Sequence, residues 1–332
     1  MFMLRSTLAL ILFTFLLSCG GRREKPKDDK PDRIVKVPTF DGDSAYGFTR
    51  KQVEFGPRIP NTGAHRMAGD YFIATFKGYG ANVTEQPFEA ITFDGQKLFL
   101  RNIIASYFPE KQKRILLAAH WDTRPFSDKD PLKPNAKFDG ANDGASGVAV
   151  LLEVARVLGK NSPPDVGVDI ILFDGEDWGE RDGTNQRIPP PEGLDSWWCL
   201  GSQHWAKHKH KPAYTAYYGI LLDMVGAKDS RFFQEGYSVE YAPRIVEKVW
   251  GTASRLGQSA FFVRQKEAKI IDDHLFVNEI GKIPMIDIVH FDPVKGYFGD
   301  YHHSQKDNMS IISKETLTVT GMVVLNVIYY EE

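Results

Sequence analysis

The sequence Ile170-Ile-Leu-Phe-Asp-Gly-Glu-Asp-Trp-Gly-Glu180 decides the fold that we predict. Its apolar start, residues 170–173, is too short and too closely followed by acids for a helix, so we expect a buried strand. Asp174, Glu176 and Asp177 follow at the carboxyl end, where open α/β sheets place their chemistry. Of two adjacent carboxylates, one can hold a metal while the other moves protons. The stretch by itself equally permits a solvated acidic turn, so the functional hypothesis needs partners from elsewhere in the chain.

The sequence around this stretch alternates apolar runs with helix-like segments. Apolar runs predict strands at residues 83–89, 98–107, 114–119, 168–173, 218–222 and 283–289. Helical spacing of apolar residues predicts helices at 64–79, 146–158, 200–208, 241–256 and 314–329. This alternation predicts a three-layer α/β/α fold with a mostly parallel central sheet. The early strands have no long helix between them, which predicts an antiparallel edge. No repeat or second linker interrupts residues 39–332, so we predict one domain there.

The amino terminus has the pattern of an export signal. Arg5 precedes a mainly apolar run from Leu8 to Leu17, which is too short to span a membrane. The run ends at Ser18-Cys19 and resembles the lipobox of bacterial lipoproteins. That resemblance implies cleavage after residue 18, lipid attachment to Cys19 and a membrane anchor in the periplasm, at the outer membrane. Residues 19–38 are polar and charged, which indicates a disordered tether. Secretion without a lipid is the alternative.

Composition limits the function further. The chain has 332 residues, 42% of them hydrophobic and 25% charged, which is ordinary for a globular protein with a large core. A net charge of −2 argues against a nucleic-acid partner, because phosphate binding favours a basic surface. Once Cys19 is lipidated, Cys199 is the one cysteine left, and no intramolecular disulfide can form.

Acidic and histidine residues also follow other predicted strands: His120 and Asp122 after one, and Asp223 after another. Further ones lie in loops or irregular segments: Asp143 in a Gly-rich loop before a helix, Asp272-Asp273-His274, and His302-His303 before the last helix. Parallel strands end at one edge of a sheet, so residues far apart in sequence can meet there. Mixed carboxylate and imidazole ligands suit zinc. The common His-Glu-x-x-His zinc motif and the Gly-x-Ser-x-Gly motif of serine hydrolases are both absent.

Several motifs together resemble a known family. These are His120-Trp-Asp, Phe138-Asp-Gly-Ala-Asn-Asp-Gly-Ala-Ser-Gly147, Asp174-Gly-Glu-Asp, Leu222-Asp-Met-Val-Gly and the late His303-Ser. Their order and spacing resemble the zinc aminopeptidase-like (phosphorylase/hydrolase-like) fold over roughly residues 99–332. Within that family, Leu200-Gly-Ser-Gln-His-Trp and above all Asp272-Asp-His resemble zinc-dependent glutaminyl cyclases, in the version found in bacterial lipoproteins.

The resemblance implies a role for each site residue. Asp143, Asp177 and His303 would hold one zinc ion per chain, and Glu176 would be the general base and acid. Asp223 and Asp272 would share a hydrogen bond and orient the amine of the substrate. Trp197 or Trp198 would form a wall of the pocket. His120 matches a second-metal ligand of two-zinc aminopeptidases, but it does not bind metal in cyclases.

The implied activity converts the amino-terminal glutamine of peptides or proteins to pyroglutamate and releases ammonia. Glu176 would take a proton from the α-amine and return one to the departing ammonia. Two alternatives remain open. A two-zinc aminopeptidase would use Glu176 to activate water and His120 to hold the second metal. A lipoprotein could also have kept the fold as a binding or scaffolding module.

Overall fold

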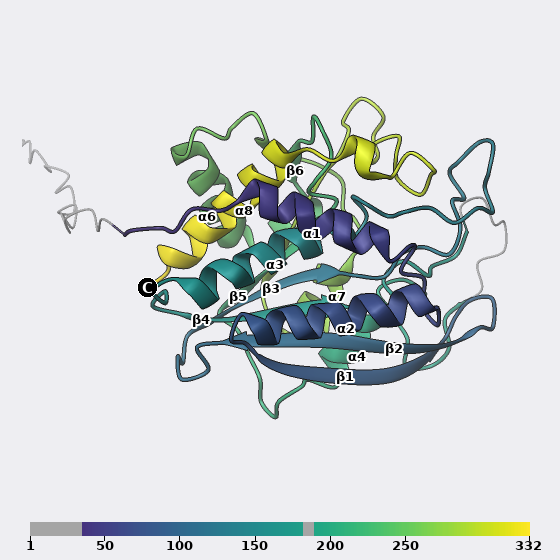
Figure 1. Ribbon diagram of the computed structural model, residues 1–332, viewed down its shortest axis with the longest axis horizontal. Coiled ribbons are helices and arrows are strands. Elements are labelled where there is room, and N and C mark those ends of the chain that lie inside the picture. The colour runs from purple at the N-terminus through teal and green to yellow at the C-terminus, as the bar shows by residue number, and fades with distance from the viewer. Residues whose placement is uncertain (1–34, 182–188) are drawn as a thin grey trace, which may run out of the picture. The chain divides into compact units, whose positions relative to one another are not determined.

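The computed structural model describes residues 35–181 and 189–332 (Figure 1). The predicted leader, Cys19 and the tether as far as residue 34 lie outside the described residues, as does the segment 182–188. The helices are α1 (Gly42–Glu54), α2 (Gly63–Gly78), α3 (Ala145–Lys160), α4 (Leu200–Lys207), α5 (Gly236–Tyr241), α6 (Pro243–Arg255), α7 (Asp273–Glu279) and α8 (Lys314–Tyr329). The strands are β1 (Asn82–Ile91), β2 (Lys97–Tyr107), β3 (Arg114–His120), β4 (Gly167–Phe173), β5 (Tyr218–Asp223), β6 (Phe232–Gln234), β7 (Phe262–Lys266) and β8 (Met285–Val289).

Six strands form the central sheet in the order β1-β2-β4-β3-β5-β8. Strands β4, β3, β5 and β8 run parallel, whereas β1 and β2 are antiparallel to their neighbours. The predicted mostly parallel sheet with an antiparallel edge is therefore confirmed. Strands β6 and β7 form a separate parallel pair that the sequence patterns did not predict.

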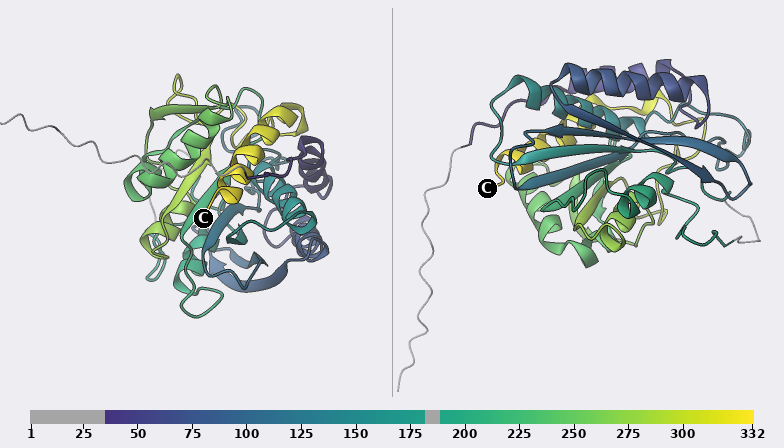
Figure 2. Two further views of the ribbon diagram at one scale, coloured as in Figure 1. Left: turned by 90° about the vertical axis from the view of Figure 1, so that its left-hand side faces the viewer. Right: turned by 90° about the horizontal axis from the view of Figure 1, so that it is seen from below.

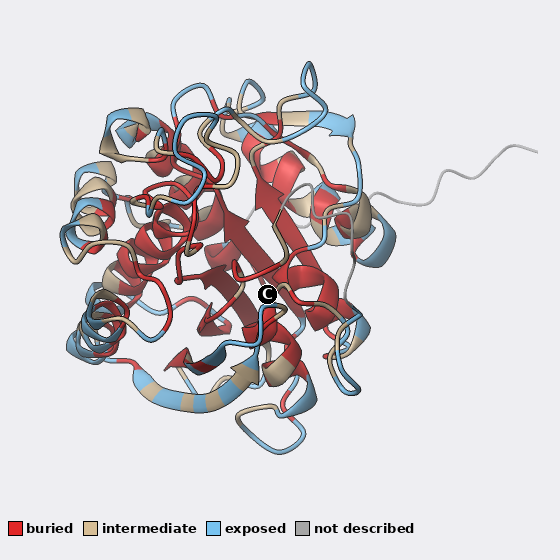
Figure 3. Cartoon of the chain, turned by 90° about the vertical axis from the view of Figure 1, so that its right-hand side faces the viewer, coloured by how far each residue is buried: buried red, intermediate tan, exposed pale blue. Residues whose placement is uncertain are grey.

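The strand of the opening stretch, β4, is buried along its whole length (Figure 3). Its side chains alternate between two apolar clusters, because successive residues of a strand point to opposite faces. Ile170 and Leu172 join the cluster that contains residues of α2, α3, α6 and α8. Ile171 and Phe173 join the cluster that contains residues of α4 and α7. Helices accordingly cover both faces of the sheet, which is the predicted three-layer arrangement (Figure 2).

The ends of several elements follow from local chemistry. Helix α8 begins after Ser313, whose hydroxyl accepts a hydrogen bond from the amide of Thr316 and caps the helix as predicted. Strand β8 begins only after Pro284 and lies at the sheet edge, both of which a proline favours. The helix predicted at 241–256 is confirmed as α6, which starts at Pro243, a residue suited to a first helical turn. The short α5, which ends at Tyr241, was not predicted.

Helices α1 and α7 were not predicted either. Helix α1 starts at an N-cap, Asp41, which accepts hydrogen bonds from two amides. Helix α7 starts directly after Asp272, so the Asp272-Asp273-His274 motif lies at a helix start. Within the described ranges, every helix is too short or too polar to cross a membrane.

Candidate active site

The site lies where parallel strands end. Strand β3 ends at His120, which is paired with Phe173, the last residue of β4, and β5 ends at Asp223. The strand ends therefore bring His120, the Glu176–Asp177 pair and Asp223 to one edge of the sheet, as the sequence predicted. Asp143 comes from the loop before α3, and its neighbour Gly144 is needed because a Cβ there would lie 2.5 Å from the carbonyl oxygen of His120.

The three predicted metal ligands converge. His303 Nε2 lies 3.0 Å from Asp177 Oδ1 and 3.5 Å from Asp143 Oδ2. All three side chains are buried, and these two carboxylate oxygens have no hydrogen-bond partner among the described residues. Buried oxygens of this kind are costly unless a cation neutralises them. One imidazole and two carboxylates form a donor set that fits zinc with a position left open.

Two further aspartates accept hydrogen bonds from the backbone at or next to the predicted ligands. Asp122 accepts hydrogen bonds from the amides of Glu176 and Asp177, at 3.0 and 3.2 Å. Asp307 accepts hydrogen bonds from the amides of Asn142 and Asp143, at 2.7 and 3.1 Å. Such outer partners hold ligands in their binding orientation.

Burial and neighbouring charges shift the pKa values of several acids in the site. Burial raises the pKa of Glu176 well above its usual range, and the nearby carboxyl groups of Asp177 and Asp272 add to that effect. Burial would also raise the pKa of Asp143, but hydrogen bonding and charge from His120 outweigh it and lower that pKa. Burial and the charge of Asp143 raise the pKa of Asp223 to about 7, against the effect of its hydrogen bond with His120. Burial and crowding thus disfavour negative charge on Glu176 and Asp223, and a cation or an amine bound among these carboxyl groups would stabilise their charged forms.

Glu176 belongs to a second group of acids beside the predicted ligands. Carboxylate oxygens of Glu176 and Asp272 and the Cys199 sulfur all lie within 4.8 Å of one another. Asp174, the third acid of the opening stretch, does not take part. It is fully buried, lies 2.9 Å from His65 Nε2 and accepts a hydrogen bond from the amide of Arg101. Its role is therefore to hold the strand end.

His120 lies between two of the acids. Its Nε2 is 3.0 Å from Asp143 Oδ1 and 3.3 Å from Asp223 Oδ1, and these three side chains form a further group that could hold a metal. A two-zinc aminopeptidase, the alternative function, would need such an arrangement for its second metal.

A cavity of about 520 Å³ opens onto this chemistry. It is lined at its base by Asp143, Glu176, Asp177, Asp223, Asp272 and His303. Trp198 lines its wall and packs against Gly179, where a Cβ would overlap the indole ring. Of the two tryptophans left open by the sequence, Trp197 is buried and does not line the cavity. Phe291, Phe298 and Ile271 make the remaining wall largely apolar.

Sequence reasoning missed several neighbours of this site. Asp287 is fully buried in the middle of β8, and ligand atoms of Asp272, His274 and Asp287 lie within 4.8 Å of one another. An acid within the apolar run of residues 285–289 was a signal that could have drawn attention to it. Glu235, 2.9 Å from His274 Nε2, carried no such signal.

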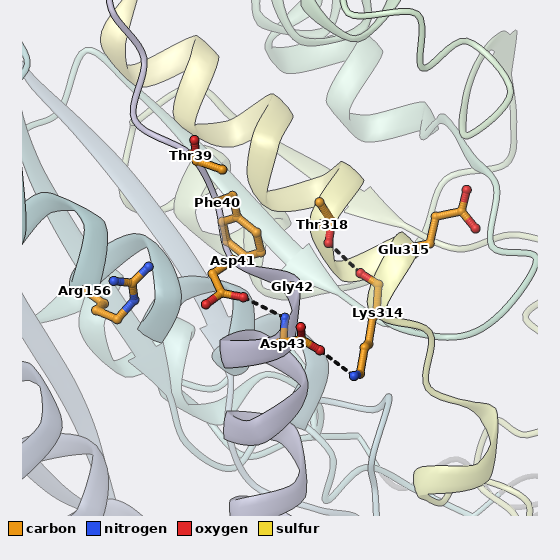
Figure 4. Close-up of a pocket in the computed structure, with 9 residues that line it drawn as sticks. All are labelled: Thr39, Phe40, Asp41, Gly42, Asp43, Arg156, Lys314, Glu315 and Thr318. Carbon is orange, nitrogen blue, oxygen red and sulfur yellow. Dashed lines mark hydrogen bonds and ion pairs between the residues drawn. The ribbon is translucent and has the colours of Figure 1, made fainter.

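A second cavity, of about 490 Å³, lies between the start of α1 and the start of α8 (Figure 4). Both basic residues that line it are already paired, Lys314 with Asp43 and Arg156 with Glu153. It lacks the convergent donors of the first cavity.

Comparison with known proteins identifies the family. The sequence signature of Peptidase family M28 matches residues 102–328. The chain belongs to peptidase family M28. One relative is the glutaminyl-peptide cyclotransferase of Drosophila melanogaster, 24% identical over 81% of this chain and 75% of the relative. The M28 signature and this relative confirm the resemblance inferred from the motifs.

Two solved structures resemble the chain over most of its length. A Zn-dependent exopeptidase from Parabacteroides distasonis is 48% identical, with a TM-score of 0.85, over 89% of this chain and all of that structure. Glutaminyl cyclase from Bacteroides thetaiotaomicron, bound to N-acetylhistamine, is 46% identical, with a TM-score of 0.84, over 90% of this chain and all of that structure. The fold prediction is confirmed, and the family supports zinc as the metal.

Proposed function

We propose that the chain is a glutaminyl-peptide cyclotransferase that converts the amino-terminal glutamine of peptides or proteins to pyroglutamate. The observation that carries the proposal is the group formed by the half-buried Glu176 and the buried Asp272 beside the proposed ligands Asp143, Asp177 and His303, in a chain 46% identical to a glutaminyl cyclase. Glu176 would be the general base and acid, and Asp223 and Asp272 would accept hydrogen bonds from the α-amine. Asp143, Asp177 and His303 would hold one zinc ion per chain.

The residues present account for the reaction. The α-amine of glutamine attacks its own γ-carbonyl carbon, so that a C–N bond forms and the bond to the amide nitrogen breaks. Glu176 takes a proton from the amine and delivers one to the leaving nitrogen, which departs as ammonia. When bound, Zn²⁺ supplies the Lewis acidity that polarises the γ-carbonyl. Fixing the amine on Asp223 and Asp272 keeps it in attack position, which lowers the entropic barrier.

Mass spectrometry of a Gln-initiated peptide tests this function. Incubation with the zinc-loaded full chain should remove one ammonia per peptide, and an otherwise identical peptide starting with Asn should stay intact. If the Gln peptide also remains unchanged, the proposal fails.

The group formed by His120, Asp143 and Asp223 favours a second candidate, a two-zinc aminopeptidase. That enzyme would release free amino acids from peptides with unmodified amino termini and would contain two zinc ions per chain. Metal analysis of the same sample therefore separates the two functions.

The location of the enzyme is also a proposal, and it rests on the sequence pattern that ends at Cys19. We propose a lipoprotein anchored in the periplasm at the outer membrane. Cell fractionation should find the wild-type chain with outer membranes and a Cys19→Ala variant elsewhere. Equal distribution of both chains would contradict a lipid anchor.

A further inference from the structure

Cys199 lies against the proposed base and is fully buried. Its sulfur is 3.3 Å from Glu176 Oε1. The backbone also joins the two segments. The amide of Cys199 donates a hydrogen bond to the carbonyl oxygen of Glu176 at 2.9 Å, and the amide of Leu200 donates one to the carbonyl oxygen of Gly175 at 3.1 Å. The start of α4 is therefore fastened to the opening stretch at the residue that would do the proton transfer.

The backbone of Cys199 is unusual for a residue with a side chain. Its φ is 59°, in the left-handed region, at the N-cap of α4. A residue with a Cβ is strained there, because the Cβ comes close to the following carbonyl oxygen. Glycine would avoid that strain and keep both backbone hydrogen bonds. A cysteine at this position thus indicates that the side chain itself contributes something.

We propose that Cys199 is a positioning residue whose thiol donates a hydrogen bond to Glu176 Oε1 and thereby fixes the orientation of the catalytic carboxyl group. With Oε1 fixed, rotation of the carboxyl group is restricted and the place of Oε2 is set. This inference rests on the proposed function, in which Glu176 must meet both the amine and the departing ammonia.

The surroundings keep the thiol in its donor form. Burial raises the pKa of Cys199 well above its ordinary value, and the negative charge of Glu176 and Asp273 raises it further. A neutral thiol is a weak donor, but a charged acceptor strengthens such a bond. The competing interpretation is that the sulfur only fills space beside Leu275 and Phe276, with which Cys199 forms an apolar cluster.

Two substitutions separate a donor from a space-filling group. Cys199→Ala removes the donor, and we expect kcat to fall about tenfold with KM nearly unchanged, because one hydrogen bond to a charged group is lost. Cys199→Ser keeps a donor and should retain most of the wild-type kcat. Ile280→Ala is the matched control, because Ile280 packs on the same apolar cluster. It should lower the melting temperature and leave kcat unchanged.

Two kinetic outcomes would overturn the inference. One is a wild-type kcat for Cys199→Ala, and the other is a loss in Cys199→Ser as large as in Cys199→Ala. Zinc content is measured in every variant, so that loss of metal is not mistaken for loss of positioning.

Infrared spectroscopy tests the contact without relying on activity. The difference between spectra of the wild-type chain and Cys199→Ser isolates the S–H stretch of Cys199, since Cys19 is common to both. We expect this band to move to higher frequency in Glu176→Gln, where the acceptor is weaker. An unchanged band would refute the hydrogen bond. If the wild-type chain cyclises no peptide, the proposed function fails on its own, while this measurement still decides the contact.

Discussion

Glu176 and Asp177 are neighbours with the same chemistry, yet the fold gives them different surroundings. Asp177 is buried with His303 Nε2 3.0 Å from its Oδ1, whereas Glu176 lies with Asp272 and Cys199 at the cavity. The sequence motif predicted both acids as functional. It could not show that Asp174 has a structural role instead, because Asp174 contacts His65, which lies on a helix more than one hundred residues away in sequence.

At this scale a pair of substitutions tests the division of roles. Glu176→Gln should keep the zinc and lower kcat by roughly 10²–10⁴, the usual range for a general acid or base. Asp177→Asn should lose the zinc, because an amide is a poorer ligand than a carboxylate. Zinc content and kcat are measured on the same samples. Loss of zinc from Glu176→Gln would show that the two roles are reversed.

Asp307 provides a test of ligand orientation. Its two oxygens accept hydrogen bonds from the amides of Asn142 and Asp143. In Asp307→Asn an NH₂ group would face an amide N–H, so we expect zinc affinity to fall roughly 10–100-fold. Competition with a chelator measures the affinity. Asp41→Asn, which alters the cap of α1, is the control and should bind zinc like the wild-type chain.

Among the elements, α5 and α7 are joined through a buried contact between a glutamate and a histidine. Glu235 accepts hydrogen bonds from the amides of Tyr237 and Ser238 at the start of α5, and it lies 2.9 Å from His274 of α7. Local patterns predicted α2, α3, α4, α6 and α8, because their apolar spacing is visible in sequence, but α1 was missed. The short α5 and α7 also escaped prediction, because tertiary contacts and capping define them more than periodicity does.

This junction should make stability depend on pH. Burial would raise the pKa of Glu235, but the hydrogen bond with His274 and the backbone amides outweigh it and lower that pKa from 4.5 to about 2. A lowered folded-state pKa contributes stability that is complete above pH 4.5 and is lost as pH falls toward 2. Urea unfolding across this window should be less pH-dependent for Glu235→Gln. The exposed Glu110→Gln is the control, and parallel curves for Glu235→Gln and wild type would contradict the assignment.

At the scale of the whole molecule, topology explains which predictions were possible. The alternation of strands and helices predicted a mostly parallel sheet. It also predicted the shared edge at which the strands that end at His120 and Asp223 finish. Asp287 and Glu235 lie beside the Asp272–His274 segment, and Cys199 lies beside Glu176, because of packing between α4, α5, α7 and β8. No local pattern reports such packing, so these residues emerge only from the folded chain.

The proposed metal ligands at this edge of the sheet should also couple metal binding to the stability of the whole domain. Asp143 and Asp177 come from segments separated by α3, and His303 comes from the loop before α8, so one ion would join three distant parts of the chain. Zinc at a thousandfold excess over its Kd stabilises the folded state by about 4 kcal/mol. In a domain of this size that amounts to a change in Tm of roughly 6 °C. Calorimetry before and after chelation should show this loss, and re-addition of zinc should reverse it. The zinc-free Asp177→Asn variant is the control and should not respond to the chelator. If it responds as strongly as the wild-type chain, the stabilising ion lies elsewhere and the ligand assignment is wrong.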